Sequence, residues 1–168
     1  MKIFLIGFMG SGKSTLGFPL ARKMDSRFID LDKYIEQAEG HTIPEIFESK
    51  GEEYFRGLES RYLKGIIDTS DDFVLSTGGG TPCFNDNMSV MNAAGKTVYL
   101  KHEPETLLGR LRNSQTVRPL LQDKTDDELR EYIADTVACR EEHYNRASVI
   151  IANPSRDVSK LVEILQYR

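Results

Sequence analysis

The fold of this chain is decided by residues 7–14, Gly7-Phe8-Met9-Gly10-Ser11-Gly12-Lys13-Ser14, which match the pattern GxxxxGK[ST]. The segment lies between an apolar run, Lys2 to Ile6, which predicts a buried strand, and a helix expected from about Lys13 to Met24. In this context the glycines let successive backbone N–H groups point at phosphates, and the helix N-terminus adds partial positive charge. The sequence therefore predicts a phosphate-binding loop, and a glycine-rich turn that binds nothing is the weaker alternative.

Two side chains of this loop have expected roles toward a nucleotide. Lys13 would neutralise β- and γ-phosphate oxygens, and the Ser14 hydroxyl would bind Mg²⁺. The loop alone leaves the class open, because GTPases, ATPases and metabolite kinases share it. The chain has no NKxD pattern on a late strand and little length for switch regions or motor insertions. These absences favour a small metabolite kinase.

The rest of the chain alternates apolar runs with segments long enough for helices. This alternation predicts an α/β fold, a five-stranded parallel sheet flanked by helices in three layers. Helices are also expected from about Thr125 to Tyr144, where Thr125 and Glu128 have the spacing of a capping box, and over the stripe from Val158 to Leu165. Further strands are expected at Phe28 to Asp30, Phe73 to Ser76, Thr97 to Leu100 and Ser148 to Ile151.

Length and composition indicate one domain over residues 1–168, because a chain of this size can bury about two thirds of its unfolded surface. A net charge of -4 argues against nucleic acid as the main partner. Cys83 and Cys139 lie far apart without metal-ligand spacing, which indicates a reduced cytoplasmic chain. We expect no targeting or membrane segment, and we assign no chemistry to the two cysteines or to His41, His102 and His143.

Two acidic residues lie at the end of the second predicted strand. Asp30 and Asp32 are two positions apart, so both side chains can face the same side of the sheet, where ligands of open α/β sheets bind. Asp30 could hold Mg²⁺ through water, and Asp32 could orient or deprotonate an accepting hydroxyl. The alternative is that both are solvated loop acids, or that one caps the next helix.

The third predicted strand ends in three consecutive glycines, Gly78, Gly79 and Gly80. Such a triplet costs chain entropy, so it predicts a backbone surface on which a substrate lies closely. A flexible turn is the other interpretation.

Arginines stand where apolar residues are expected. Arg140 shares a helical face with Leu129, Ile133 and Val137, and a carboxylate ligand would be a suitable bidentate partner for it. The alternative is an arginine that extends to solvent near a helix C-terminus. Arg56 has two interpretations as well, a carboxylate clamp or a surface ion pair with nearby glutamates.

The polar stretch from about residue 112 to 124 predicts a mobile lid. It contains Arg118 just before Pro119, so lid closure could bring this charge onto a transferring phosphoryl group. An arginine that stays in solvent is the alternative.

Taken together, these segments resemble the shikimate kinases. The stretches GFMGSGKST, FIDLD, IFESKGEEYFR, STGGG and TVRPLL occur in the order of that family and at about its spacing, over residues 3 to about 165. The resemblance implies phosphorylation of the 3-hydroxyl of shikimate with ATP and Mg²⁺ by a cytoplasmic monomer, as a step of aromatic amino acid biosynthesis. It also implies a shikimate-binding segment at about residues 32–60.

The resemblance implies a role for each site residue. Shikimate would be contacted by Asp32, Arg56, Gly78, Gly79, Gly80 and Arg140, with the two arginines on its carboxylate and support from Phe47, Phe55 and Glu59. ATP would be bound by Gly10, Ser11, Gly12, Lys13, Ser14, Thr15, Arg112, Arg118 and Asn153. Ser14 and Asp30 would hold Mg²⁺, and the catalytic residues would be Lys13, Asp32 and Arg118.

The chain departs from the family pattern at three places. Pro19 falls inside the first helix next to Phe18, so we expect a bend or a cost in stability there. Ala152 stands where the family often has a hydrogen-bonding side chain beside the adenine. The lid is about one residue shorter than in some relatives, which leaves Arg110 or Arg112 as the adenine-side arginine.

Two other functions remain open from the sequence. Gluconate kinase or another small-metabolite kinase shares the phosphate loop, although Arg56, Arg140 and the glycine triplet argue against it. A non-catalytic module that uses ATP as a switch is the rival from a different class, and for it the paired acids and the lid arginine would be superfluous.

Overall fold

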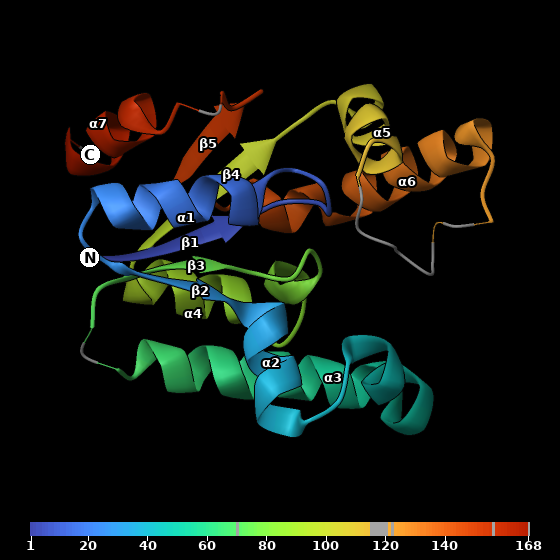
Figure 1. The fold of residues 1–168 in the computed structure, drawn as a ribbon, viewed down its shortest axis with the longest axis horizontal. Helices are drawn as coiled ribbons and strands as arrows, with labels where there is room; N and C mark the ends of the chain where they lie inside the picture. The colour runs from blue at the N-terminus through green and yellow to red at the C-terminus, as the bar shows by residue number, and fades with distance from the viewer. Residues whose placement is uncertain (70, 115–120, 122, 156, 168) are drawn as a thin grey trace.

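The computed structural model describes residues 1–69, 71–114, 121, 123–155 and 157–167. Its centre is one sheet of five parallel strands, as the sequence predicted, and the strand order is β2-β3-β1-β4-β5. Figure 1 shows the sheet with helices on both sides. The strands are β1 (Lys2–Ile6), β2 (Arg27–Asp30), β3 (Phe73–Ser76), β4 (Lys96–Lys101) and β5 (Val149–Ala152).

The two faces of the sheet bury alternate residues of the same strands. Phe4 and Ile6 of β1 face a cluster built with α2, α3 and α4, whereas Ile3 and Leu5 face α1 and α7. This alternation follows from the two-residue period of a strand and produces the three predicted layers. The helices are α1 (Lys13–Lys23), α2 (Leu31–Glu39), α3 (Ile43–Ile67), α4 (Asn87–Ala94), α5 (Pro104–Arg112), α6 (Asp126–Tyr144) and α7 (Ser159–Tyr167), with a short 3-10 helix η1 (Thr81–Cys83).

The starts of two helices show why the chain turns where it does. Thr125 accepts a hydrogen bond from the Glu128 N–H at 3.3 Å, and the Glu128 carboxylate accepts one from the Thr125 N–H at 2.8 Å. The capping box predicted for α6 is therefore confirmed. Thr42 and Glu45 form a second capping box at the start of α3, which the sequence analysis did not predict.

Two helices contain irregular residues. Pro19 lies inside α1, which nevertheless continues to Lys23, and the neighbouring Phe18 ring is exposed and makes an edge contact with Phe28. In α3 the backbone leaves the helical conformation at Gly51, where φ is 81°, so this helix is kinked there. A glycine adopts such a φ without strain.

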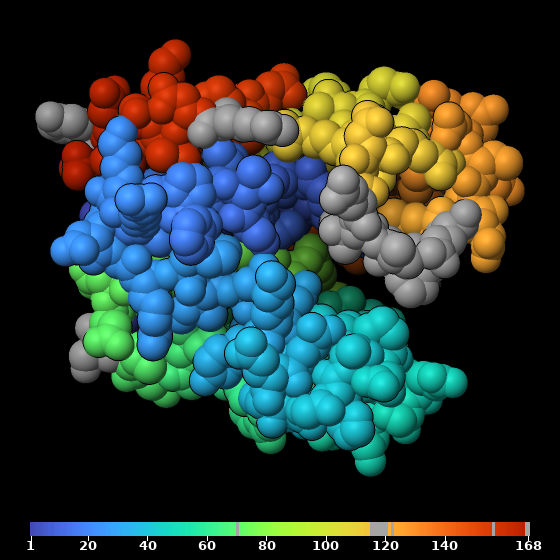
Figure 2. All heavy atoms as spheres, in the orientation of Figure 1, coloured from blue at the N-terminus to red at the C-terminus, as the bar shows by residue number. Residues whose placement is uncertain are grey.

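A third apolar cluster joins α5 and α6 to the phosphate loop. Phe8 of the loop is buried against Leu107, Leu111 and Ile133 of these helices. Figure 2 shows the surface hollowed between the segment of α2 and α3 and the segment of α5 and α6. Within the described ranges, no helix is both long and apolar enough to cross a membrane.

Candidate active site

The phosphate loop has the backbone that its glycines predict. Gly7, Gly10 and Gly12 have φ values of 143°, 79° and 94°, which side chains with a Cβ rarely adopt. Lys13 is buried and its Nζ donates hydrogen bonds to the carbonyls of Gly7 at 2.8 Å and Phe8 at 3.0 Å. The ammonium group is thus held across the mouth of the loop, where it can meet phosphate oxygens.

Ser14 and Asp30 lie side by side, as their predicted shared role requires. The Ser14 hydroxyl donates to an Asp30 carboxylate oxygen at 2.7 Å and lies 3.2 Å from the Ser76 hydroxyl. Asp30 also caps α2 by accepting from the Lys33 N–H at 3.3 Å. Asp30 therefore acts as a helix cap, which was one interpretation of the sequence. It also lies beside Ser14, as the other interpretation, a shared Mg²⁺ site, requires.

These oxygens suit a small hard cation. Mg²⁺ prefers oxygen ligands and usually keeps several waters, with one or two protein groups and the substrate phosphates completing its shell. Among the described residues, no group of three or more His, Cys, Asp or Glu side chains could hold a metal by itself. A site of one hydroxyl and one carboxylate fits an ion that arrives with phosphates.

Asp32 is half-buried at the start of α2, and its surroundings change its protonation. Burial, followed by the negative charges of Glu59, Asp30 and Glu36, raises the pKa of Asp32 to about 6, while the positive charge of Lys13 opposes the shift. A carboxyl group with this pKa is mostly ionised at neutral pH and still accepts a proton readily.

The glycine triplet is packed closely by functional side chains. A Cβ on Gly78 would lie 2.7 Å from the Glu59 carboxylate, 2.9 Å from the Thr81 hydroxyl and 3.0 Å from the Asp32 carboxylate. A Cβ on Gly80 would lie 2.6 Å from Arg56. A Cβ at either position would force these side chains to shift, so close approach favours glycine at Gly78 and Gly80.

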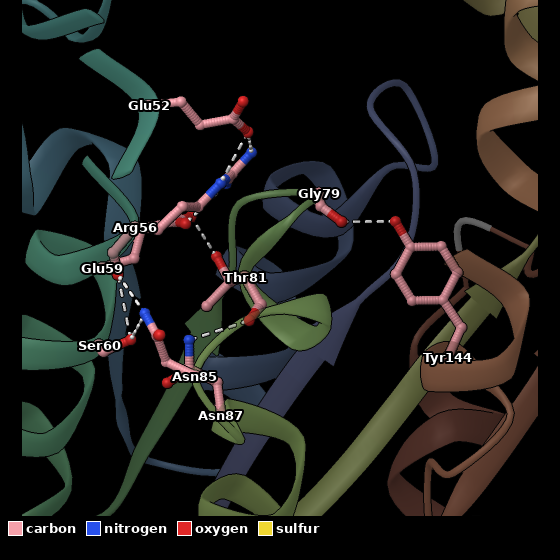
Figure 3. Close-up of polar contacts among 9 residues, drawn as sticks. All are labelled: Glu52, Arg56, Glu59, Ser60, Gly79, Thr81, Asn85, Asn87 and Tyr144. Carbon is pink, nitrogen blue, oxygen red and sulfur yellow. Dashed lines mark hydrogen bonds and ion pairs between the residues drawn. The ribbon is translucent and has the colours of Figure 1, made fainter. Parts of the chain in front are cut away.

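Arg56 belongs to a network that Figure 3 shows on the α3 side of this loop. Its Nη1 donates to Glu59 at 2.7 Å and its Nη2 donates to Glu52 at 3.0 Å. The other Glu59 oxygen accepts from the Thr81 hydroxyl at 2.5 Å, and both Glu59 and Thr81 are fully buried. The guanidinium group also lies over the Phe84 ring, 4.3 Å from its centre. Arg56 thus forms the ion pairs with nearby glutamates that one interpretation of the sequence expected. These contacts also orient its guanidinium group beside the glycines.

Arg140 and Tyr144 approach the same loop from α6. A Cβ on Gly79 would lie 3.3 Å from Nη1 of Arg140, and the Gly79 carbonyl accepts a hydrogen bond of 2.5 Å from the Tyr144 hydroxyl (Figure 3). Burial raises the pKa of Tyr144, which keeps its hydroxyl protonated as a donor. Arg56 and Arg140 therefore reach neighbouring glycines of one loop from two helices.

One cleft of about 1010 Å³ connects the phosphate loop with the acidic residues. Its lining includes Lys13, Ser14, Asp30, Asp32 and Gly79. Among the other predicted residues, Gly10, Gly12 and Thr15 line it, whereas Ser11, Arg56, Gly78, Gly80 and Arg140 do not.

The structure separates the two candidates for the adenine-side arginine. Arg110 lines the cleft next to Gly12, whereas Arg112 bonds Asp126 at 2.5 Å and the Lys124 carbonyl at 2.7 Å, outside the cleft lining. Asn153 lines a smaller neighbouring cavity of about 270 Å³, and Pro154 lines both. Of the two, Arg110 is thus the one that lines the cleft, whereas the sequence analysis named Arg112 for ATP and left Arg110 as the alternative.

Two predictions about the lid fall outside the described residues. These are the position of Arg118 and the course of residues 115–120 and 122. Of the predicted lid, Asn113 and Ser114 line the cleft.

Sequence reasoning missed four residues that support the site: Ser76, Thr81, His102 and Tyr144. Tyr144 follows Arg140 by four residues on one helix face, so helical spacing could have indicated it. Ser76 ends a predicted strand beside the cleft, which was a weaker signal. Thr81 and His102 contact residues far away in sequence, and no local pattern marks such pairs.

Comparisons with known proteins agree with this geometry. A family model described as shikimate kinase matches residues 9–166. The shikimate kinase of Azobacteroides pseudotrichonymphae is 43% identical over 164 residues, covering 98% of this chain and 96% of that protein. That of Bacteroides thetaiotaomicron is 47% identical over 150 residues, covering 89% of this chain and 85% of that protein.

Solved structures show the same likeness. A crystal structure of shikimate kinase from Bacteroides thetaiotaomicron has a TM-score of 0.91 and 43% identity, covering 99% of this chain and 96% of that chain. A shikimate kinase from Acinetobacter baumannii in complex with shikimate has a TM-score of 0.86 and 33% identity, covering 98% of this chain and 92% of that chain. With the family model matching nearly the whole chain and these relatives aligned over most of their length, this protein belongs to the shikimate kinase family.

Proposed function

We propose that this enzyme transfers the γ-phosphoryl group of ATP to the 3-hydroxyl of shikimate, giving shikimate 3-phosphate and ADP. Membership of the shikimate kinase family supports this reaction. The structural observation that carries it is the single cleft lined by the phosphate loop, Asp30, Asp32 and Gly79. A nucleotide on the loop and an acceptor beside Asp32 would share this cleft, as direct transfer requires. The product feeds the synthesis of aromatic amino acids.

The proposed chemistry is an in-line displacement without a covalent enzyme intermediate. Asp32 orients the acceptor hydroxyl and takes its proton, the oxygen bonds to the γ-phosphorus, and the bond to the β,γ-bridging oxygen breaks to release ADP. Lys13 exchanges the Gly7 and Phe8 carbonyls for phosphate oxygens and stabilises their charge. Arg118 is proposed to add a second positive charge from the lid.

Ser14 and Asp30 are the residues proposed to hold Mg²⁺. Their oxygens lie 2.7 Å apart, so Ser14 can bind the ion directly and Asp30 can reach it through water. When bound, the ion neutralises charge on the β- and γ-phosphates.

The acceptor is proposed to lie against Gly79, with its carboxylate between Arg56 and Arg140. Both arginines approach the glycine triplet, and guanidinium groups bind carboxylates with two parallel hydrogen bonds. Arg56 would exchange the exposed Glu52 for the ligand and keep the buried Glu59. The residues proposed to bind both substrates belong to one domain, and we propose a monomer as the active unit.

The test is release of ADP from Mg-ATP in the presence of shikimate, with gluconate and no acceptor as parallel controls. We expect ADP release to depend on shikimate. We also expect Arg56→Ala and Arg140→Ala to raise the KM for shikimate at least tenfold. Arg61→Ala is the matched control for Arg56→Ala. Arg61 is an exposed arginine of α3, the helix that also carries Arg56, and it forms an ion pair with Glu39. Release that is equal with gluconate, or independent of any acceptor, would contradict the proposal.

A further inference from the structure

His102 is a buried, titratable side chain that the proposed reaction does not use. It follows β4, is 5% exposed, and is absent from the lining of the cleft. Its Nε2 lies 3.0 Å from the carbonyl oxygen of Ser11, so the ring contacts the phosphate loop from behind.

The protonation of the ring follows from its surroundings. Burial and the neighbouring charge of Arg110 lower the pKa of His102, although contacts with the Ser11 carbonyl and the Asn153 side chain oppose this shift. A carbonyl only accepts hydrogen bonds, so Nε2 carries the hydrogen of a neutral ring. Within the described residues, Nδ1 of the ring makes no hydrogen bond.

Ser11 depends on its backbone for its position. Its side chain is fully buried, and its hydroxyl has no hydrogen-bond partner among the described residues. Its N–H donates to the Phe8 carbonyl at 3.1 Å, and its own carbonyl receives His102 at 3.0 Å and the longer contact of Arg110 at 3.5 Å. Arg110 lines the cleft, whereas His102 is absent from its lining.

The same ring also contacts the segment on the other side of the nucleotide site. The Asn153 N–H donates to the Lys101 carbonyl at 2.8 Å, and Asn153 has a left-handed φ of 47°. This bond holds the loop after β5 against the end of β4, next to His102. The imidazole therefore lies between the loop that binds phosphates and the loop proposed to enclose adenine.

We infer that His102 is a positioning residue for nucleotide binding, which holds the Ser11 carbonyl so that the N–H groups of the phosphate loop point into the cleft. Through its contact with Asn153 it also fixes the phosphate loop relative to the adenine side. This inference rests on the proposed use of ATP. It requires a hydrogen-bond donor at the position of Nε2 and no titration of the ring.

A pair of amide variants tests the position of that donor. In His102→Gln the amide nitrogen can occupy the place of Nε2 and donate to Ser11, whereas the shorter side chain of His102→Asn reaches only the place of Nδ1. We expect the Gln variant to bind ATP within about threefold of the unchanged protein and the Asn variant to bind roughly tenfold more weakly. Affinity is measured by titration calorimetry with ATP alone, and the KM for shikimate is expected to stay unchanged in both.

A general loss of stability is separated from this effect by Thr97→Val. Thr97 is a fully buried polar residue of β4, the strand that His102 follows, and it bonds Asn92 and Ser148 away from the cleft. We expect this variant to melt at a lower temperature and to bind ATP normally. Equal ATP affinity of the Gln and Asn variants, or weakened binding in Thr97→Val in proportion to its lower Tm, overturns the inference. If the unchanged protein itself fails to bind ATP, the proposed function fails instead.

Discussion

The Thr81 hydroxyl donates a 2.5 Å hydrogen bond to the Glu59 carboxylate, whose other oxygen accepts from Arg56 at 2.7 Å. Both Thr81 and Glu59 are fully buried, and Thr81 follows directly on the glycine triplet. This contact fastens α3 to the loop on which the acceptor is proposed to lie. It also means that one carboxylate positions both Arg56 and the segment opposite it.

Thr81→Val should destabilise the protein while keeping nearly the same volume. The change leaves one oxygen of a buried carboxylate without its donor, which costs about 2 kcal/mol. Urea unfolding measures this loss, and KM for shikimate is expected to rise because Glu59 no longer holds Arg56 firmly. Thr81→Ser keeps the hydroxyl and is the control. If the Val variant were as stable as the Ser variant, the bond would contribute nothing.

Activity should rise with pH through the titration of Asp32. Its pKa is raised to about 6, and the proton-accepting form is the ionised one, so kcat/KM is expected to increase to a plateau above pH 7. The same shift affects stability in the opposite sense. The folded-state pKa of Asp32 lies above the unfolded value of 3.8. The contribution of Asp32 to the free energy of unfolding is therefore fully present below about pH 4 and is lost as the pH rises through 6.

Asp32→Asn checks this sign. The variant should lose most of its turnover. Its change in the free energy of unfolding, relative to the unchanged protein, should be about 1–2 kcal/mol more stabilising at pH 8 than at pH 4. Denaturant unfolding at the two pH values is the measurement, with the exposed Asp135→Asn as the control. A variant that is equally affected at both pH values would show that Asp32 has an ordinary pKa.

The charge of Glu59 should be visible in the pH profile of Asp32. Glu59 contributes to the raised pKa of Asp32, so Glu59→Gln is expected to move the acid limb of kcat/KM to lower pH. Glu52→Gln is the matched control, because Glu52 pairs with the same Arg56 but is not among the groups that shift Asp32. Its profile should keep its midpoint. A shift of equal size in both variants would point to Arg56 as the common cause.

Gly78→Ala should damage both stability and turnover. The new Cβ would lie 3.0 Å or less from the side chains of Glu59, Thr81 and Asp32, so these side chains have to shift, at a cost of about 1–3 kcal/mol. Turnover should fall at least a hundredfold, because small displacements of reacting groups are costly.

Gly57→Ala is the control on α3, where a Cβ would meet nothing within 4 Å, and we expect it to stabilise the protein slightly. Unfolding curves and initial rates of both variants give the answer, and normal turnover in Gly78→Ala would argue against the tight geometry around Asp32.

Much of the fold and of the nucleotide site could be predicted from local sequence. The phosphate loop combines the glycines, Lys13 and Ser14 in one continuous segment, and the alternation of apolar runs determines the parallel sheet. Asp30 and Asp32 could be predicted to line the cleft because they lie at the end of β2 and just beyond it. In each case the signal is carried by neighbouring residues and by the periods of helix and strand.

The tertiary structure alone decided how distant segments meet. It selected Arg110 over Arg112 for the cleft, placed Thr81 on Glu59, and placed His102 behind Ser11. The last two contacts join residues that are 22 and 91 positions apart. Pairs of this kind are brought together only when the core packs, because a hydrogen bond between distant residues leaves no periodic pattern in the chain. The sequence by itself thus determined the type of fold and the loop that binds phosphate, while packing decided which polar side chains hold that loop and the glycine triplet in place.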